Sequence, residues 1–469
     1  MAAQPESIAV TRHDVSRQIA SFAAGFDASS IPREVFERAK HLILDSIGIA
    51  FASGGYDFAA KALAGVCALD SGAGKTAVIG HNERLDLRNA ILMNGILVHG
   101  LDFDDTHAKG VIHATASVLP TVLGVAAAQA KSGKELLTAY VLGIELATRL
   151  GAVAKGGFHQ LGFHPTGLVG TFGCAMAAAW LMGANTQQCQ DALGLSLSTA
   201  AGSLEFLEDG AWNKRMHPGW AGAAAVTSAT LAMNGYRGTS RPIEGRFGLF
   251  NSYLGERWGF DIDLATENLG NAWEVLAVSV KPLPACHFTH AAVDAAIRLH
   301  QQGLRKEDIE SIHVLVPYEV IKTVCEPLES KRRPANSYEA QFSIPYLVAT
   351  GLLKGRMTLE ELEDQALSDP EVLKLCKITN YAADPDTAFP KYYDGEVIVH
   401  LKNGKVLRER EAINRGAVDR PLTSDDIKQK FYDNMALRVT PQRAEQVERA
   451  VLDLDGSTAN ELARILGQA

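Results

Sequence analysis

Apolar residues recur at helical spacing along most of the chain. After Pro32, for example, they repeat every three or four positions, at Val35, Phe36, Ala39, Leu42, Ile43 and Ile47. Such a repeat places the apolar side chains on one face of a helix. The same pattern predicts helices over residues 8–26, 85–100, 114–131, 134–154, 166–183, 189–204 and 219–234, with breaks at Gly, Asn and Pro. Residues 7 to 272 are therefore predicted to form a succession of helices.

The pattern changes in the next part of the chain. Residues 309–316 alternate between apolar and polar, which is typical of a half-buried strand. Residues 396–400 and 405–410 flank Asn403-Gly404, a pair that favours a two-residue hairpin turn. Helical spacing returns over residues 422–436, 441–453 and 457–467. We therefore predict a mainly α protein, with a large helical-bundle domain (residues 1–274 and 418–469) and a smaller α/β lid domain (residues 275–417).

Composition and charge narrow the classes of protein and partner. The chain has 469 residues, of which 47% are hydrophobic and 21% charged, as is typical of a globular protein with more than one core. The formal net charge of −9 disfavours nucleic acid and anionic membranes as main partners. Six dispersed cysteines without a Cys-x-x-Cys pair suit the reducing cytoplasm. We therefore expect a cytoplasmic protein with no nucleic-acid or membrane partner.

One uncharged stretch passes a crude length test for a membrane span. It covers residues 165–190, is rich in Ala and Gly, and contains four consecutive polar residues at 185–188. This composition favours a helix of small residues that is buried inside the bundle.

Polar chemistry is concentrated in four short motifs. HGLDFDDTH (99–107), followed by His113, brings three carboxylates and three imidazoles within fifteen residues. The other three are FHPTG (163–167), KRMHPG (214–219) and KPLPACHFTH (281–290). Each adds His or Lys near the predicted start of an apolar helix, where anions are favoured. Together the four motifs indicate carboxylate binding and proton transfer.

Metal binding is the main rival interpretation of the aspartate-rich motif. Its spacing fits neither the EF-hand loop nor His-Glu-x-x-His, and the chain lacks an Asp-Asp-x-x-Asp order there. We therefore predict an activity that needs no metal. Gly167, Gly170 and Gly173 are spaced by threes, which suits helix packing better than a dinucleotide-binding motif, so we predict no cofactor either. A second alternative is a capped helix end with solvated Asp residues. We expect His99 and His107 to be structural, and the sequence leaves His217 and His287 open between packing and a role in the site.

These motifs, in this order, resemble those of the MmgE/PrpD family over nearly the whole chain. The resemblance rests on HGLDFDDTH with the following HxxxSVLP, on FHPTG, on KxxHxG and on KPxPxCxxTH. It implies a helical domain with a smaller lid, a homodimer, and a small di- or tricarboxylate as substrate. It also implies a set of pocket residues: Asp102, His113, His164 and Lys214 as catalytic residues, and Thr106, His290 and Tyr346 as substrate-binding residues.

The reactions of this family, as the resemblance implies, develop negative charge on a carbon next to a carboxylate. Lys214 is expected to stabilise that charge, His113 and His164 to transfer protons, and Asp102 to orient an imidazole or hydroxyl. We favour a dehydratase, although the DFDD and KRMHPG sequences depart from the members that process 2-methylcitrate. A decarboxylase of a cis-aconitate-like substrate and an epimerase of an iminodisuccinate-like substrate stay open. So does a non-catalytic ligand-binding protein.

Overall fold

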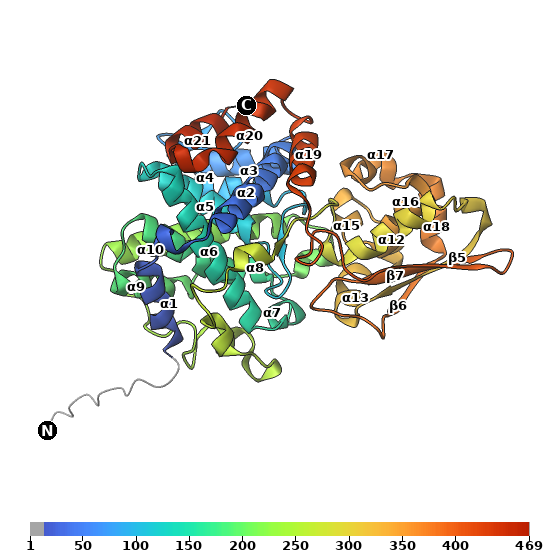
Figure 1. Ribbon diagram of the computed structural model, residues 1–469, viewed down its shortest axis with the longest axis horizontal. Coiled ribbons are helices and arrows are strands. Elements are labelled where there is room, and N and C mark those ends of the chain that lie inside the picture. Colours follow the sequence, from blue (N-terminus) through green and yellow to red (C-terminus); the bar gives the residue numbers. More distant parts are fainter. Residues whose placement is uncertain (1–13, 469) are drawn as a thin grey trace.

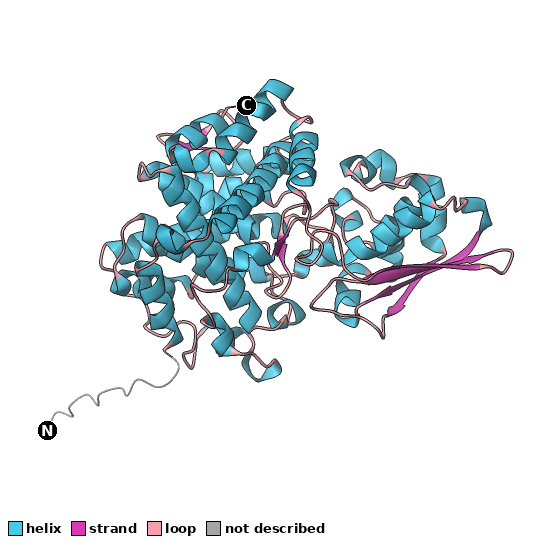
Figure 2. Ribbon diagram, viewed as in Figure 1, coloured by secondary structure: helices cyan, strands magenta, loops and turns pink. Residues whose placement is uncertain are grey.

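The computed structural model describes residues 14–468, and these form a mainly helical protein, as predicted (Figures 1 and 2). Six helices build the centre of the larger part: α2 (Arg33–Ser53), α4 (Leu87–Val98), α5 (Ala114–Ala128), α6 (Gly133–Val153), α8 (Pro165–Leu181) and α10 (Asn213–Met233). Around them lie α1 (Val15–Ala24), α3 (Asp57–Ala68), α7 (Gly157–Gln160), α9 (Thr186–Ser196) and α11 (Leu249–Tyr253). The C-terminal helices α19 (Ser424–Met435), α20 (Pro441–Leu452) and α21 (Ala459–Leu466) return to this part and pack against α2 and α5 (Figure 1).

The central helices are buried on almost every side because small residues let their backbones approach closely. Every residue of α8 except Trp180 is buried, which confirms the expectation of a helix hidden in the bundle. Among the described residues, α6 is the one helix long and apolar enough to span a membrane, and 94% of the apolar window is buried inside the protein. Burial of this kind is typical of a core helix.

The smaller part places helices on one face of a four-stranded sheet (Figure 2). The strand order is β6-β5-β7-β8, with bounds β5 (Ile309–Val316), β6 (Thr379–Ala383), β7 (Gly395–Leu401) and β8 (Val406–Glu411). Only β5 and β6 pair in parallel. The helices of this part are α12 (His290–Gln301), α13 (Ile321–Val324), α14 (Leu328–Arg332), α15 (Ser337–Ala340), α16 (Ile344–Lys354), α17 (Asp364–Leu367) and α18 (Pro370–Lys377). Alternate residues of β7 are buried, as the period of two requires.

Most of the predicted elements are confirmed, and the bounds predicted for two helices were wrong. The strand at residues 309–316 and the hairpin around Asn403-Gly404 are present. The helix predicted over 189–204 spans Thr186–Ser196, and the one predicted from residue 219 begins at Asn213. Pro218 therefore lies inside α10, near its start. Because Pro has no N–H, the helix lacks the hydrogen bond from residue 218 to the backbone carbonyl of residue 214. Of the helix predicted over residues 8–26, residues 8–13 lie outside the described part.

Buried apolar side chains form two separate clusters. One draws on residues 15–280 and 427–466, and the other on residues 283–401 together with Phe206. The division into domains at 274/275 and 417/418 stays a prediction. Phe206 belongs to the second cluster although its neighbours in sequence lie in the larger part, so the two parts meet near it.

The contact between α4 and α10 depends on glycine. An alanine Cβ at Gly219 would lie 2.2 Å from the carbonyl oxygen of Leu92, so Gly219→Ala should force the two helices apart. Overpacking of this kind typically costs about 1–3 kcal/mol of stability. A Cβ at the exposed Gly65 of α3 meets nothing within 4 Å, so Gly65→Ala should be neutral or stabilise by about 1 kcal/mol. Denaturant unfolding of both variants tests this, and equal midpoints would contradict it.

Candidate functional site

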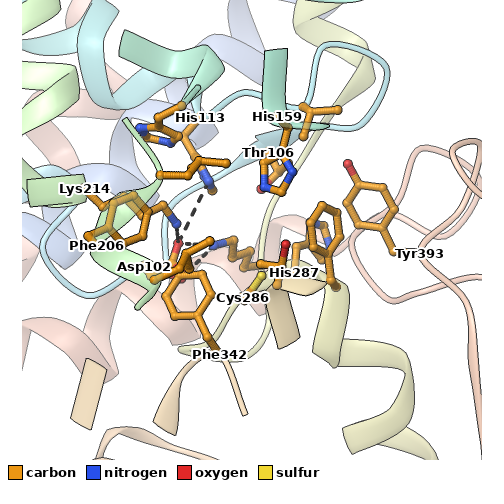
Figure 3. A pocket seen from close by; sticks show the side chains of 17 residues that line it. Asp102, Thr106, His113, His159, Phe206, Lys214, Cys286, His287, Phe342 and Tyr393 are labelled. Atoms are coloured by element: carbon orange, nitrogen blue, oxygen red, sulfur yellow. Dashed lines mark hydrogen bonds and ion pairs between the residues drawn. The ribbon is translucent and has the colours of Figure 1, made fainter. Parts of the chain in front are cut away.

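A pocket of about 40 Å³ lies where the two parts of the protein meet (Figure 3). Five of the seven predicted site residues line it: Asp102, Thr106, His113, His164 and Lys214. The smaller part and the segment leading to it add further lining residues, which include Lys281, Cys286, His287, Phe342 and Tyr393. The pocket therefore draws on all four motifs that the sequence singled out.

Local structure explains why these side chains converge. Helix α4 ends at Val98, and in the loop that follows Asp102 adopts a left-handed backbone conformation with φ 48°. The short strand β3 (Thr106–His107) then pairs with β4 (Val278–Ser279), which brings the loop beside the KPLPACHFTH motif. His113 and His164 are the N-cap residues of α5 and α8, and Lys214 lies in the first turn of α10. Three helix starts therefore face one loop.

Asp102 is the centre of a buried charge cluster. Its Oδ1 accepts hydrogen bonds of 2.8 Å from both Lys214 Nζ and Lys281 Nζ, and Lys281 also donates to the Asp102 backbone oxygen at 2.7 Å (Figure 3). Burial alone would raise the pKa of Asp102, but the two ammonium groups outweigh it and hold the pKa well below its usual range. Asp102 Oδ2 has no hydrogen-bond partner among the described residues. This cluster is therefore charged, and one of its carboxylate oxygens can still accept a hydrogen bond.

Three imidazoles in or beside the pocket, those of His99, His113 and His164, are hydrogen-bonded through Nδ1. His99 Nδ1 lies 2.8 Å from the Asp104 carboxylate, His113 Nδ1 lies 2.9 Å from the Asp105 backbone oxygen, and His164 Nδ1 lies 3.0 Å from His217 Nδ1. A carbonyl oxygen only accepts, so His113 carries its proton on Nδ1 and keeps a lone pair on Nε2. Burial also lowers the pKa of His113 and of His164 well below the usual range. The uncharged form of both rings is therefore favoured.

The other two predicted site residues, His290 and Tyr346, are not brought to the pocket lining. His290 lies behind His287, with ring centroids 4.8 Å apart, and its Nε2 donates to the backbone oxygen of Ala285 at 3.1 Å. Tyr346 is buried in the smaller part, where its hydroxyl donates to the backbone oxygen of Glu361 at 2.7 Å. His290 Nε2 and the Tyr346 hydroxyl are thus bound to backbone oxygens, and His287 lines the pocket instead of His290.

Several lining residues had no predicted role. Lys281 and His287 both stand in the KPLPACHFTH motif, so the motif itself was the signal for them. His287 Nε2 accepts from Asn414 Nδ2 at 2.9 Å, and the Tyr393 ring lies 5.1 Å away. No sequence pattern marks Phe342 or Tyr393, because only the packing of the smaller part brings them to the pocket.

The pocket also contains nitrogen atoms that could hold a metal ion. His99, His113 and His164 each offer one ring nitrogen, and these atoms lie within 4.8 Å of one another. The spacing rules applied to the sequence missed this set because its members come from two motifs that are far apart in the chain. Whether catalysis is independent of metal stays a prediction.

Comparisons with known proteins give consistent results across the chain. The MmgE/PrpD N-terminal domain family matches residues 17–261, and the MmgE/PrpD C-terminal domain family matches residues 283–455. Cis-aconitate decarboxylase of Mus musculus is 28% identical over 96% of this chain and 93% of its own length. A cis-aconitate decarboxylase-like protein of Aspergillus oryzae is 24% identical over 97% and 98%, respectively. 2-Methylcitrate dehydratase of Escherichia coli is 25% identical over 81% and 79%.

A buried carboxyl group beside the pocket gives a pH prediction. Burial raises the pKa of Asp105 to about 7, although Thr115 donates a hydrogen bond to its carboxylate. In the unfolded chain the pKa of Asp is about 3.9. Between about pH 4 and pH 7 the folded protein therefore holds a proton that the unfolded chain has lost, and stability falls as the pH rises through this window.

Asp105→Asn removes this titration. The melting temperature of the variant should therefore fall less than that of the wild type when the pH rises from about 5 to about 8. Thermal melts at four or five pH values measure the difference. Parallel pH profiles for the two proteins would show that Asp105 is ionised in the folded protein throughout this range.

Proposed function

The chain belongs to the MmgE/PrpD family, and we propose that it is a lyase that removes water from a small hydroxy-substituted di- or tricarboxylate. The named relatives are lyases of small carboxylates, and the low-identity similarity covers at least 79% of each chain. The observation that carries the proposal is His113, a neutral imidazole with a free Nε2 in a pocket that contains two ammonium groups. A base beside two cations suits proton removal next to a carboxylate. That the protein is a cytoplasmic homodimer stays a prediction.

The first step follows from the charges around His113. A substrate carboxylate binds to Lys214 and Lys281, and the ammonium groups stabilise the charge that develops on it when the neighbouring C–H bond breaks. His113 Nε2 accepts that proton. The imidazolium that forms is stabilised by two carboxylates, with Nε2 4.0 Å from Asp102 Oδ1 and Nδ1 3.7 Å from Asp104 Oδ2. Thr106, at the edge of the pocket, helps to position the substrate.

The second step needs an acid, and His164 lies close to His113, with ring centroids 6.0 Å apart. His164 Nε2 has no hydrogen-bond partner among the described residues, and its Nδ1 contacts His217. The negative charges of a bound substrate favour a proton on His164. As the C–O bond breaks, His164 gives this proton to the departing hydroxyl, which leaves as water, and a carbon–carbon double bond forms. The enzyme then carries the proton on His113 and releases it to solvent before the next cycle.

Decarboxylation is the second candidate, and the comparisons favour it. Cis-aconitate decarboxylases of Mus musculus and Aspergillus terreus align with 96% and 95% of this chain, respectively. In that reaction the same imidazoles protonate the carbanion that remains when carbon dioxide leaves. The two lysines would again hold the carboxylate that stays on the substrate.

The pocket in this structure is too small for either substrate. Ligand pockets typically measure about 300–1,000 Å³, compared with about 40 Å³ here. A second cavity of about 520 Å³ shares the lining residues Val111, His159 and Phe288 with the pocket. We propose that the substrate reaches the pocket through this outer cavity, and that the two parts of the protein move apart to admit it.

A substrate panel tests the proposed reaction. Citrate-like hydroxy acids, cis-aconitate-like acids and iminodisuccinate are incubated with the protein, and the products are analysed by mass spectrometry. We expect loss of water from a hydroxy acid. Loss of carbon dioxide would establish the second candidate instead. Stereochemical inversion without a mass change, or binding without any turnover, would contradict a lyase and favour an epimerase or a ligand-binding protein, respectively.

Substitutions separate catalysis from binding. Lys214→Ala removes a cation that stabilises developing charge, and such a loss typically lowers turnover by about 10²–10³. His113→Ala removes the base, with an expected loss of about 10²–10⁴. Thr106→Ala should mainly raise KM, because this hydroxyl moves no proton. The matched control is His313→Ala, since this half-buried His lies on β5 in the sheet, outside the pocket lining.

Steady-state kinetics give kcat and KM for the four variants, and thermal melts show whether each one folds. His313→Ala should keep the turnover of the wild type. Turnover near the wild-type value in folded His113→Ala would remove this residue from the mechanism and make His164 the base.

A further inference from the structure

We propose that His99, His113 and His164 form a binding site for one divalent transition-metal ion, and that the bound ion inhibits the enzyme. The inhibitory role rests on the proposed function, in which His113 is the base. The binding site itself does not. The site includes His99, which takes no part in the proposed catalytic mechanism.

The three rings are arranged around a common point. Their centroids lie 4.7 Å (His99–His113), 5.7 Å (His99–His164) and 6.0 Å (His113–His164) apart. One ring nitrogen from each lies within 4.8 Å of the other two. His99 is 1% and His164 is 3% exposed, yet the Nε2 atoms of both lack a hydrogen-bond partner among the described residues. A buried imidazole nitrogen without a partner is costly, and an ion would satisfy it.

The surroundings orient each ring for metal binding. Metal-binding histidines usually donate their other ring N–H to a carboxylate or a backbone carbonyl, which fixes the tautomer and the ring plane. Here the carboxylate of Asp104 is the acceptor for His99 Nδ1, and the backbone oxygen of Asp105 is the acceptor for His113 Nδ1. His164 Nδ1 lies 3.0 Å from His217 Nδ1, and it is the donor in the tautomer that binds the ion. Each ring then contacts its partner through Nδ1, and Nε2 is left for the ion.

Charge and donor type select the class of ion. Asp102 binds the ammonium groups of Lys214 and Lys281, and Asp104 contacts His99 Nδ1. The atoms offered to the ion are therefore imidazole nitrogens. Such donors suit Zn²⁺, Cu²⁺ and Ni²⁺, whereas Mg²⁺ and Ca²⁺ prefer oxygen. Three histidines also leave a coordination position for water or a substrate carboxylate.

Binding and catalysis compete for the same lone pair. Nε2 of His113 cannot coordinate an ion and accept a proton from the substrate at the same time. An ion in the site would also occupy space in a pocket of about 40 Å³. We therefore expect the ion and the substrate to exclude each other, so that Zn²⁺ raises the apparent KM.

The test starts from full-length protein treated with a chelator and then freed of it. Isothermal titration with Zn²⁺ should show one ion bound per chain. His99→Gln should weaken binding by at least the roughly 10–100-fold seen when only a supporting partner of a ligand is lost. The matched control is Cys67→Ser, because Cys67 is the exposed cysteine and a competing surface ligand. This control should bind Zn²⁺ as the wild type does. Thermal melts establish folding.

The outcomes separate this inference from the proposed function. Zn²⁺ binding that is lost in His99→Gln, together with inhibition reversed by chelator, supports the site and its role. If chelated protein is active but binds no Zn²⁺, or if folded His99→Gln binds it like the wild type, the site is overturned and the proposed function stands. If activity is lost on chelation and restored by Zn²⁺, the inhibitory role and the metal-free mechanism are both overturned.

A spectroscopic measurement covers the case in which His99→Gln does not fold. Co²⁺ is added to the wild-type protein in place of Zn²⁺, and its absorption spectrum reports the ligands. Intense visible bands without sulfur-to-metal charge transfer support nitrogen ligands at low coordination number. The weak spectrum of a hexahydrated ion, or a sulfur band that disappears in Cys67→Ser, overturns the site.

Discussion

The rest of the site depends on the ion pairs of the buried Asp102 carboxylate with two lysines. The carboxylate binds Lys214 from α10 and Lys281 from the segment before α12, and its own loop adopts a left-handed backbone at residue 102. A buried charge that loses its partner typically costs about 3–5 kcal/mol. Each of the three charges therefore requires the others, and three distant segments of the chain must meet at one point. The pocket exists because these charges can be buried only together.

The same burial sets the chemistry of the imidazoles. Removal from water disfavours the charged form of His113 and His164, and lowers the pKa of both. Neutral rings can accept protons, and the carboxylates of Asp102 and Asp104 stand close enough to stabilise the imidazolium that follows. In the proposed mechanism, the charges of an anionic substrate favour a proton on His164 when the substrate enters. Proton transfer is then coupled to the arrival of the substrate.

The sequence predicted best those elements that depend on the local pattern of residues, and those site residues whose side-chain type indicates a chemical role. The alternation of residues 309–316 predicted the strand β5, and three of the four motifs located five lining residues, from Asp102 to Lys214. It was least informative where tertiary packing decides. His287 and His290 are three residues apart in one motif, and only the packing of the short helix at His287–Thr289 turns the first toward the pocket. Likewise, Tyr346 is turned into the smaller part by the helix start that Ser343 caps.

The central claim is that His113 is a neutral base whose proton resides on Nδ1. Nuclear magnetic resonance of protein labelled with ¹⁵N-histidine tests it most directly, because the shifts of the two ring nitrogens distinguish both neutral tautomers from the imidazolium. The His113 signals are assigned by their absence in His113→Gln. Near neutral pH and without substrate, we expect a neutral ring with a protonated Nδ1 and a bare Nε2. An imidazolium, or a neutral ring protonated on Nε2, would contradict the account.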